Sequence, residues 1–248
     1  MDYSRLFHHR SKEHGAGRRA HASPEAAAQA ASTIHYKVYL RCEVVELPRP
    51  DIACSLSDAI RQRASRHADG AALSLDDIGG LLLWSGGIVG GKAPREGEAR
   101  PSRRAHPSGG ARYPIELYLL NLAGGELARG VYHYRVREHV LEAVFGGEVL
   151  DDAKDLFRYD WIARSSAVVV MTAIFDRTQD KYGERGYRYV LVEAGHIGQN
   201  LSLVGAARGI GVTMLGGTND PAMEALLDLD GTTESVIYSA ALSKASTR

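Results

Sequence analysis

The residues best suited to chemistry stand in a turn bounded by prolines. Residues 106–122 read H-P-S-G-G-A-R-Y-P-I-E-L-Y-L-L-N-L, and in them Ser108 and the pair Gly109–Gly110 stand between Pro107 and Arg112. Because glycine has no Cβ, a flat or anionic ligand can closely approach the backbone amides of such a turn. The alternating apolar residues that follow predict a β-strand. The turn is therefore either a connection before an edge strand or one wall of a ligand site.

Two other segments carry groups that suit the same kind of ligand. Arg63, Ser65 and His67 occupy alternate positions near the end of a predicted helix. Guanidinium and hydroxyl donors that converge on one point suit a phosphate monoester, although an arginine-rich helix end can equally be solvated. The pair Gly216–Gly217 follows a predicted strand, and no glycine segment matches a P-loop or a dinucleotide fingerprint. Together the three segments predict one site for an anionic, aromatic ligand.

Composition excludes several classes of protein. The 248 residues contain 30 basic and 30 acidic side chains, so no net field favours nucleic acid or an anionic membrane. Cys42 and Cys54 stand outside any metal-type spacing, and a reducing compartment is the simpler context. The apolar runs are too short to span a bilayer, and the first residues do not resemble a signal peptide. We expect a cytoplasmic protein with no metal, no nucleic-acid partner and no membrane association.

Capping residues predict the elements in front of the turn. Ser57 is expected to begin a helix that runs to about Arg66, and Ser74 with Asp77 forms an acidic capping box at the start of a second helix. Residues 88–105 are rich in Gly, Arg, Glu and Pro and show no periodicity. They are therefore predicted to form a long surface loop.

The segments after the turn predict a sheet with a covered central strand. Residues 131–136 and 140–145 are expected to form a hairpin, and a helix is expected near residues 148–158. Residues 166–175 are apolar on both faces, as a strand covered on both sides requires. Two further strands are predicted at residues 213–215 and 234–240.

The longest predicted helix has an unusual surface. It runs from about Tyr187 to Arg208, and Gly195, Gly198, Ser202 and Gly205 recur in it at helical spacing. Each glycine inside a helix costs about 0.5–1 kcal/mol relative to alanine, so close approach of another helix or a ligand ring is the expected reason. We expect this helix to be buried nearly all round, in the core of the domain or of a dimer.

The N-terminal part of the chain differs in composition from the rest. Residues 1–33 are rich in Arg, His, Ala, Gly and Ser without sustained apolar periodicity, although residues 24–31 could form a short helix. Residues 34–47 suggest a strand. We therefore expect a flexible arm over residues 1–33 and one domain over residues 34–248.

In their order along the chain these motifs resemble the nitroreductase superfamily of FMN proteins. They resemble most closely its SagB-type branch, the azoline dehydrogenases of thiazole/oxazole-modified peptide biosynthesis. Residues 63–67 (R-A-S-R-H) stand where the superfamily has R-x-S-x-[R/K], with His67 replacing the usual Arg or Lys. The resemblance covers roughly residues 36–238. Three further matches are to P-S-x-G-x-x-Y-P at 107–114, to G-x-Y-x-Y at 130–134 and to the long-helix signature at 193–201.

The resemblance implies a fold, a cofactor and a set of contacts. The fold would be α+β, with a central, mostly antiparallel sheet flanked by helices, a long buried core helix, and a homodimer that binds FMN at the subunit interface. The FMN contacts implied are Arg63, Ser65, His67, Pro107, Ser108, Gly109, Arg112, Gln199, Gly216 and Gly217.

The branch also carries a Lys–Tyr pair associated with catalysis, and Lys181-Tyr182 stands at the matching place. Oxidation of an azoline to an azole removes a proton from one ring carbon and a hydride from its neighbour. The flavin takes the hydride, so the protein must supply a base, and a lysine serves only if desolvation or a nearby cation lowers its pKa. Tyr182 would relay the proton or orient the lysine; the alternative is a solvated pair in a polar loop. His196 is expected to be a buried histidine without an acid–base role.

Three functions follow from this resemblance. The leading one is an FMN-dependent dehydrogenase of azoline rings in a ribosomally made peptide, with dioxygen reoxidising the flavin and a cyclodehydratase as a candidate partner. The second is another flavin enzyme on the same scaffold: an NAD(P)H-dependent nitro, quinone or enone reductase, or an oxidase of another natural product. The third is a flavin-less subunit that binds a partner enzyme or leader peptide, a reading that His67 keeps open.

Overall fold

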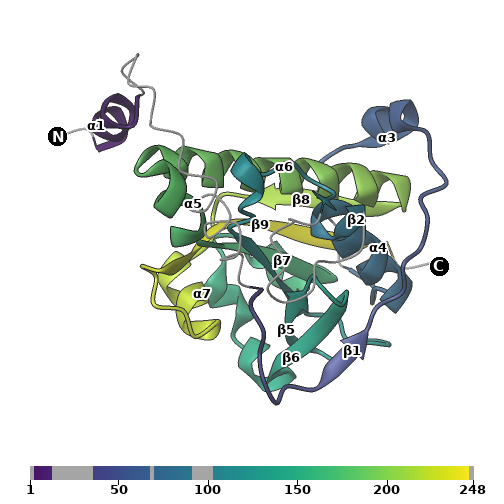
Figure 1. The fold of residues 1–248 in the computed structure, drawn as a ribbon. Coiled ribbons are helices and arrows are strands. Elements are labelled where there is room, and N and C mark those ends of the chain that lie inside the picture. Colours follow the sequence, from purple (N-terminus) through teal and green to yellow (C-terminus); the bar gives the residue numbers. More distant parts are fainter. Residues whose placement is uncertain (1–2, 13–35, 68–69, 91–102, 246–248) are drawn as a thin grey trace.

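A seven-stranded sheet forms the centre of the molecule. The computed structural model describes residues 3–12, 36–67, 70–90 and 103–245. All neighbouring strands of the sheet are antiparallel, and helices cover both of its faces (Figure 1). In spatial order the strands are β1 (Val44–Glu46), β6 (Val140–Gly146), β5 (Gly130–Arg135), β4 (Ile115–Asn121), β7 (Ala167–Ile174), β9 (Glu234–Lys244) and β8 (Ile210–Leu215).

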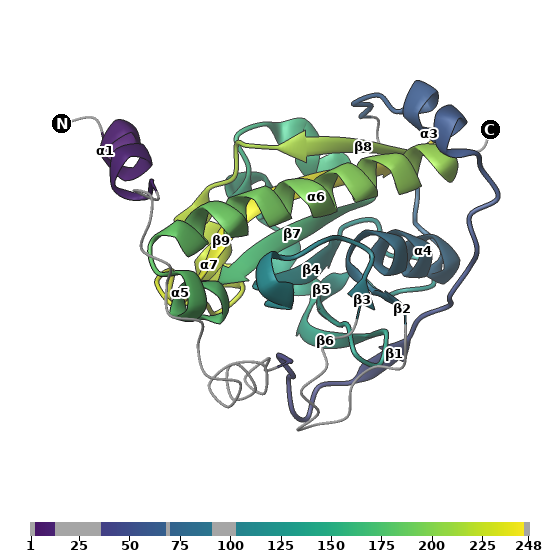
Figure 2. The same ribbon diagram turned by 45° about the horizontal axis from the view of Figure 1, so that its top comes forward.

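The helices differ in length and in the face that they cover. The α-helices are α1 (Tyr3–Arg10), α3 (Leu56–Gln62), α4 (Leu75–Gly86), α5 (Asp176–Tyr182), α6 (Arg185–Ala207) and α7 (Asp220–Leu226). Short 3-10 helices are η1 (Gly109–Ala111), η2 (Gly147–Leu150), η3 (Ala153–Leu156) and η4 (Asp160–Arg164). Helices α4 and α6 lie side by side on one face of the sheet, as Figure 2 shows. None of the described helices is both long and apolar enough to cross a bilayer.

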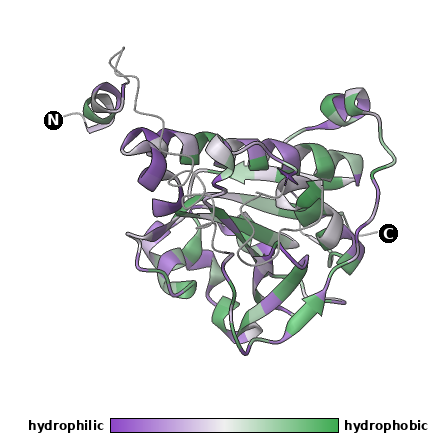
Figure 3. Ribbon diagram, viewed as in Figure 1, coloured by the Kyte–Doolittle hydropathy of each residue, from purple (hydrophilic) through white to green (hydrophobic). Residues whose placement is uncertain are grey.

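The two faces of the sheet belong to separate apolar clusters. In β7 the side chains of Val169 and Met171 pack with α4 and α6, whereas those of Val168 and Val170 pack with α7 and the 3-10 helices. β7 pairs with β4 and β9, and it is buried along almost its whole length. The predicted covered strand at residues 166–175 is therefore confirmed. The green colour of the central strands in Figure 3 contrasts with the hydrophilic helix α5.

Other local predictions agree with the structure in part. Ser74 accepts a hydrogen bond from the Asp77 amide at 3.1 Å, and Asp77 accepts one from the Ser74 amide at 3.2 Å, which confirms the capping box. The predicted hairpin is formed by β5 and β6. Helix α3 begins two residues earlier than predicted because Ser55, not Ser57, caps it by accepting from the Asp58 amide. It ends at Gln62 because the chain turns to an extended conformation at the next residue.

Three predicted elements differ from the structure. Residues 88–90 and 103–104 pair as strands β2 and β3, so the ends of the predicted loop form a small sheet; residues 91–102 lie outside the described residues. The helix near residues 148–158 is a series of 3-10 turns. Within residues 36–47 the strand is confined to β1.

The predicted N-terminal arm is only partly described. Residues 3–10 form helix α1, and the predicted helix at residues 24–31 lies outside the described residues. The division of the chain at residue 33 stays a prediction.

The long helix α6 is buried on one face and exposed on the other. Gly198 and Gly205 allow it to approach β8: a Cβ at Gly198 would lie 2.8 Å from the Met214 side chain. The predicted stripe therefore faces a strand of the same chain, and Gly195 is not part of it, since a Cβ there would meet no described atom within 4 Å. His196 is exposed, so its predicted burial is wrong. Within the single chain the sheet covers one side of the helix, and burial of the other side by a second copy stays a prediction.

Candidate functional site

The P-S-G-G turn and helix α5 meet at Gly110. Gly110 lies in η1 with φ +63°, a conformation that glycine adopts without strain. A Cβ at this position would lie 2.9 Å from Nζ of Lys181 and would also collide with the hydroxyl of Tyr182. The structure therefore places both predicted catalytic residues directly against the turn, in the last turn of α5 rather than in a loop.

Aromatic side chains support this junction. The ring of Tyr182 stands edge-on to that of Tyr189 in α6, with ring centroids 5.0 Å apart. Nζ of Lys181 lies 5.3 Å from the centroid of the Tyr182 ring. Gly109 packs on Tyr189, since a Cβ at Gly109 would lie 3.5 Å from that side chain. The turn, α5 and α6 thus form one corner of the molecule.

Two polar side chains of the turn, those of Ser108 and Arg112, form hydrogen bonds within the protein. Ser108 accepts a hydrogen bond from the Tyr113 amide at 2.8 Å, which closes the turn. Arg112 is buried, and its Nε donates to the carbonyl oxygen of Arg177 at 2.5 Å. The structure therefore gives Arg112 a role between the turn and α5, whereas Pro107 is exposed at the start of the turn.

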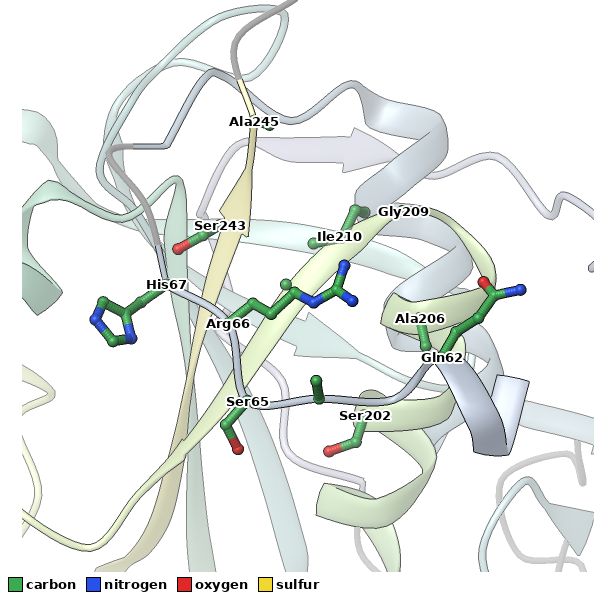
Figure 4. Close-up of a pocket in the computed structure, with 12 residues that line it drawn as sticks. Gln62, Ser65, Arg66, His67, Ser202, Ala206, Gly209, Ile210, Ser243 and Ala245 are labelled. Carbon is green, nitrogen blue, oxygen red and sulfur yellow. The ribbon is translucent and has the colours of Figure 1, made fainter. Parts of the chain in front are cut away.

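A cavity of about 530 Å³ lies beside the C-terminal half of α6 (Figure 4). Its polar lining comes from Ser65, Arg66 and His67 on the segment after α3, and from Ser202 and Ser243 on α6 and β9. The Ser243 hydroxyl is buried and has no hydrogen-bond partner among the described residues. A cavity with a guanidinium, an imidazole and an unused hydroxyl fits an anionic group such as a phosphate.

The three motif residues of this segment have different surroundings. Ser65, Arg66 and His67 line the cavity, whereas Arg63 does not. Contact of these residues with FMN stays a prediction. The Arg66 carbonyl accepts from the Thr213 hydroxyl at 3.1 Å, which holds the segment along β8. The ring of His67 stacks on Trp161 at 4.4 Å between centroids. Sequence reasoning missed Arg66 because the spacing of the motif directs attention to alternate positions.

The cavity and the turn lie along the same helix. Asn200 donates to the carbonyl of Ala105 at 3.2 Å, and Gly109 packs on Tyr189. Residues 105–109 therefore run along α6 from Asn200 to Tyr189. Ser202 of α6 lines the cavity. At a rise of 1.5 Å per residue, it lies about 20 Å along the helix from Tyr189.

The remaining predicted FMN contacts lie either between the cavity and the P-S-G-G turn or away from both. Gln199 is exposed one turn of α6 from Ser202, on the same helical face and in the direction of the turn. Gly216 is exposed at the end of β8, where a Cβ would meet no described atom within 4 Å. Gly217 is half-buried, and its carbonyl accepts from the Arg158 amide at 2.8 Å. The structure thus brings Gln199 near the predicted site and places the glycine pair at the end of β8 away from the cavity.

A buried charged network supports the corner from the opposite face of the sheet. His133 directs Nδ1 to Glu142 at 2.8 Å and Nε2 to Glu116 at 3.1 Å, and Glu116 also pairs with Arg177. Burial opposes ionisation of Glu116, but Arg177 and His133 outweigh it and lower its pKa to about 2. Burial likewise opposes protonation of His133, but its two carboxylate partners raise its pKa. Sequence reasoning missed this network, although His133 and Glu142 alternate with apolar residues in the predicted hairpin.

A second buried histidine joins the turn to α6. Nε2 of His106 lies 3.1 Å from Oε1 of Glu193, and both side chains are almost fully buried. The His106 ring stands edge-on to Tyr113, which also lies 4.5 Å from the buried guanidinium of Arg104. Both ends of the P-S-G-G turn are therefore fixed by buried polar contacts.

Fold and site together define an α+β protein of the nitroreductase type. A long helix packs on an antiparallel sheet, and it runs from the cavity lined by Arg66, Ser202 and Ser243 to the P-S-G-G turn. The chain belongs to the nitroreductase family, whose model matches residues 60–242. The predicted α+β fold of the chain is thereby confirmed, and the homodimer stays a prediction.

Three related proteins narrow this assignment. A protein of Methanocaldococcus jannaschii named as a nitroreductase is 29% identical over 192 residues, 75% of this chain and 91% of the relative. The trifolitoxin-processing protein TfxB of Rhizobium leguminosarum is 33% identical over 54% of this chain and 38% of its own length. The microcin B17-processing protein McbC of Escherichia coli is 31% identical over 52% of this chain and 49% of its own length. The alignments thus span less than half of the two peptide-processing relatives, and these matches confirm the resemblance to the SagB-type branch.

Two solved structures support the fold. The Escherichia coli microcin synthetase McbBCD complex with truncated pro-MccB17 bound aligns with a TM-score of 0.64 at 23% identity, over 99% of this chain and 92% of that chain. A nitroreductase of Desulfovibrio desulfuricans in complex with FMN aligns with a TM-score of 0.50 at 20% identity, over 78% of this chain and 90% of that chain.

Proposed function

We propose that this chain is an FMN-dependent dehydrogenase that converts azoline rings of a ribosomally made peptide to azoles. The observation that carries the proposal is the junction at Gly110, where Lys181 and Tyr182 lie directly against the P-S-G-G turn. The peptide-processing relatives and the FMN in a structural neighbour support it.

The residues present fit FMN as a cofactor. Its phosphate would be held by Arg66, His67 and the hydroxyls of Ser65, Ser202 and Ser243, which line the cavity beside α6. Its ring would lie toward the P-S-G-G turn, with the exposed amide of Gln199 between the two parts. Bound there, FMN would supply the acceptor for a hydride, and dioxygen would reoxidise it.

The chain itself supplies the proton acceptor. An azoline loses two hydrogens on aromatisation, one as a proton and one as a hydride. In the neutral form, the Lys181 amine would accept the proton from one ring carbon while the adjacent C–H bond gives up the hydride. The Tyr182 hydroxyl, held beside Gly110 with Lys181, would orient the amine.

A homodimer and a partner enzyme complete the proposal. Leu191 and Val192 are 41% and 56% exposed on the outer face of α6, a surface that a second copy would cover. Val192→Arg should shift the protein from dimer to monomer in sedimentation velocity runs. The McbBCD complex contains several proteins, and by analogy we expect a cyclodehydratase to deliver the peptide substrate.

The decisive experiment is Lys181→Ala in protein loaded with FMN. We expect the visible absorbance of bound flavin to be retained and azoline oxidation to fall about 100-fold or more, the usual scale for loss of a general base. Lys154→Ala, a change at a 3-10 turn outside the site, is the control and should leave turnover unchanged. Oxidation at the wild-type rate by Lys181→Ala would refute the mechanism.

A second measurement separates this function from a reductase. Rapid anaerobic bleaching of the flavin by NADPH, without turnover of an azoline peptide, would identify a nitro, quinone or enone reductase. Colourless purified protein that does not take up FMN would instead identify a flavin-less binding subunit.

A further inference from the structure

Arg112 and Arg177 exchange hydrogen bonds between the turn and α5. Nε of Arg112 donates to the carbonyl oxygen of Arg177, and Nη1 of Arg177 donates to the carbonyl oxygen of Tyr113 at 3.2 Å. Both guanidinium groups are buried. Each segment therefore holds the backbone of the other, across 65 residues of sequence.

Arg177 is also the point where α5 is joined to the sheet. It pairs with Glu116 of β4, which binds His133 of β5, which in turn binds Glu142 of β6. Every side chain in this series is buried. A charge in such a place is costly to leave without its partner, so the position of the Arg177 side chain is tightly constrained.

Helix α5 also contacts α6: Tyr182 stands edge-on to Tyr189, and Gly186 packs on the backbone of Gln179. The sequence of α5 is D-R-T-Q-D-K-Y, which contains no aliphatic side chain, and the residues that it buries are Arg177 and Thr178. A helix of two turns without an apolar face derives little stability from propensity alone. Of its side chains, Arg177 supplies the buried ion pair that ties α5 to the sheet.

The helical repeat connects this anchor to the proposed catalytic pair. Lys181 follows Arg177 by four residues, and Tyr182 follows Thr178 by four, so each pair shares a face of α5. Building on the proposed function, we infer that Arg177 is a positioning residue that holds Lys181 and Tyr182 against Gly110. It acts through α5 and does not itself exchange a proton with the substrate.

The test combines turnover with a measurement that needs no substrate. Arg177→Met should lower kcat for azoline oxidation about 100-fold, the scale of a small misplacement of a catalytic group, with KM little changed. In a Lys181→Ala background the same change should have no further effect on kcat. Arg177→Lys, which keeps the charge but not the fork of donors, should recover part of the loss.

Hydrogen exchange measures the position of α5 directly. Arg177→Met should speed amide exchange at residues 177–182 about tenfold or more, the scale of one lost hydrogen bond or more, while exchange in α7 is unchanged. The matched control is Arg129→Met, because Arg129 also bonds a carboxylate and two backbone carbonyls, those of Asp151, Gly147 and Leu150. This control should change neither kcat nor exchange in α5.

The outcomes separate the two proposals. Unchanged exchange in α5 for both Arg177 variants, or equal losses of kcat with and without Lys181, would overturn the positioning role. Wild-type turnover by Lys181→Ala would overturn the proposed function, and the exchange result would still decide the role of Arg177.

Discussion

Nδ1 of His133 lies 2.8 Å from Oε2 of Glu142, and both side chains are completely buried. Because the other ring nitrogen faces Glu116, the doubly protonated imidazole satisfies both carboxylates at once. The imidazole lies on β5, between two strands that support the corner of the proposed site.

His133 should make the free energy of unfolding depend on pH. Its pKa is raised in the folded state, so its contribution is fully present below the unfolded pKa near 6.5 and is lost as pH rises through the folded value. Urea unfolding from pH 6 to pH 9 should show this decline, and His133→Gln should flatten it. An equally steep decline in the variant would contradict the assignment.

Glu116→Gln should strongly destabilise the fold. It leaves Arg177 buried without its anionic partner, which costs about 3–5 kcal/mol. Because the pKa of Glu116 is about 2 in the folded state, the wild type should lose this contribution only as pH falls below about 4.5 toward that value. The comparison variant is Glu138→Gln, which removes an exposed ion pair with Arg135. It should lower the free energy of unfolding by less than about 1 kcal/mol in the same experiment.

Gly110→Ala should impair turnover more than a matched glycine change. The new methyl group would collide with the Tyr182 hydroxyl and the Lys181 amine as well as adopt a strained φ. Gly124 has a similar φ of +71°, but a Cβ there would meet its nearest neighbour only at 3.8 Å. Gly124→Ala therefore carries the backbone strain alone. Similar kcat values for the two variants would argue against a role of the Gly110 junction in catalysis.

FMN affinity should distinguish the two arginines of the R-A-S-R-H segment. Arg66→Met should raise the Kd of FMN about tenfold to hundredfold, since bonds to a charged group contribute about 1.5–3 kcal/mol. Arg63→Met should have a much smaller effect because Arg63 lies outside the cavity lining. Fluorescence titration of the apoprotein measures both. A larger effect of Arg63 would show that the phosphate binds outside this cavity.

Ser243→Ala tests the same cavity from the opposite strand. The buried hydroxyl has no partner among the described residues, so its removal should leave the melting temperature of the apoprotein nearly unchanged. The Kd of FMN should rise about tenfold if the hydroxyl binds the phosphate. An unchanged Kd together with a lower melting temperature would assign Ser243 a structural role.

Local patterns in the sequence predicted much of the scaffold. The Ser74–Asp77 box, the apolar segment that forms β7 and the long helix α6 depend on neighbours within a few residues, so capping and periodicity were sufficient. The residue types of the P-S-G-G turn also singled it out, whereas the Lys181-Tyr182 pair was singled out by the resemblance to the SagB-type branch.

Tertiary structure alone decided how these parts meet. The exchange between Arg112 and Arg177 joins segments with no shared local pattern, and the position of Lys181 over Gly110 follows from it. Likewise, the side chain that lines the cavity is that of Arg66 because its backbone is bonded to β8, a strand almost 150 residues away in sequence. Sequence determined which groups could do the chemistry; long-range packing and buried charge determined which of them were brought together.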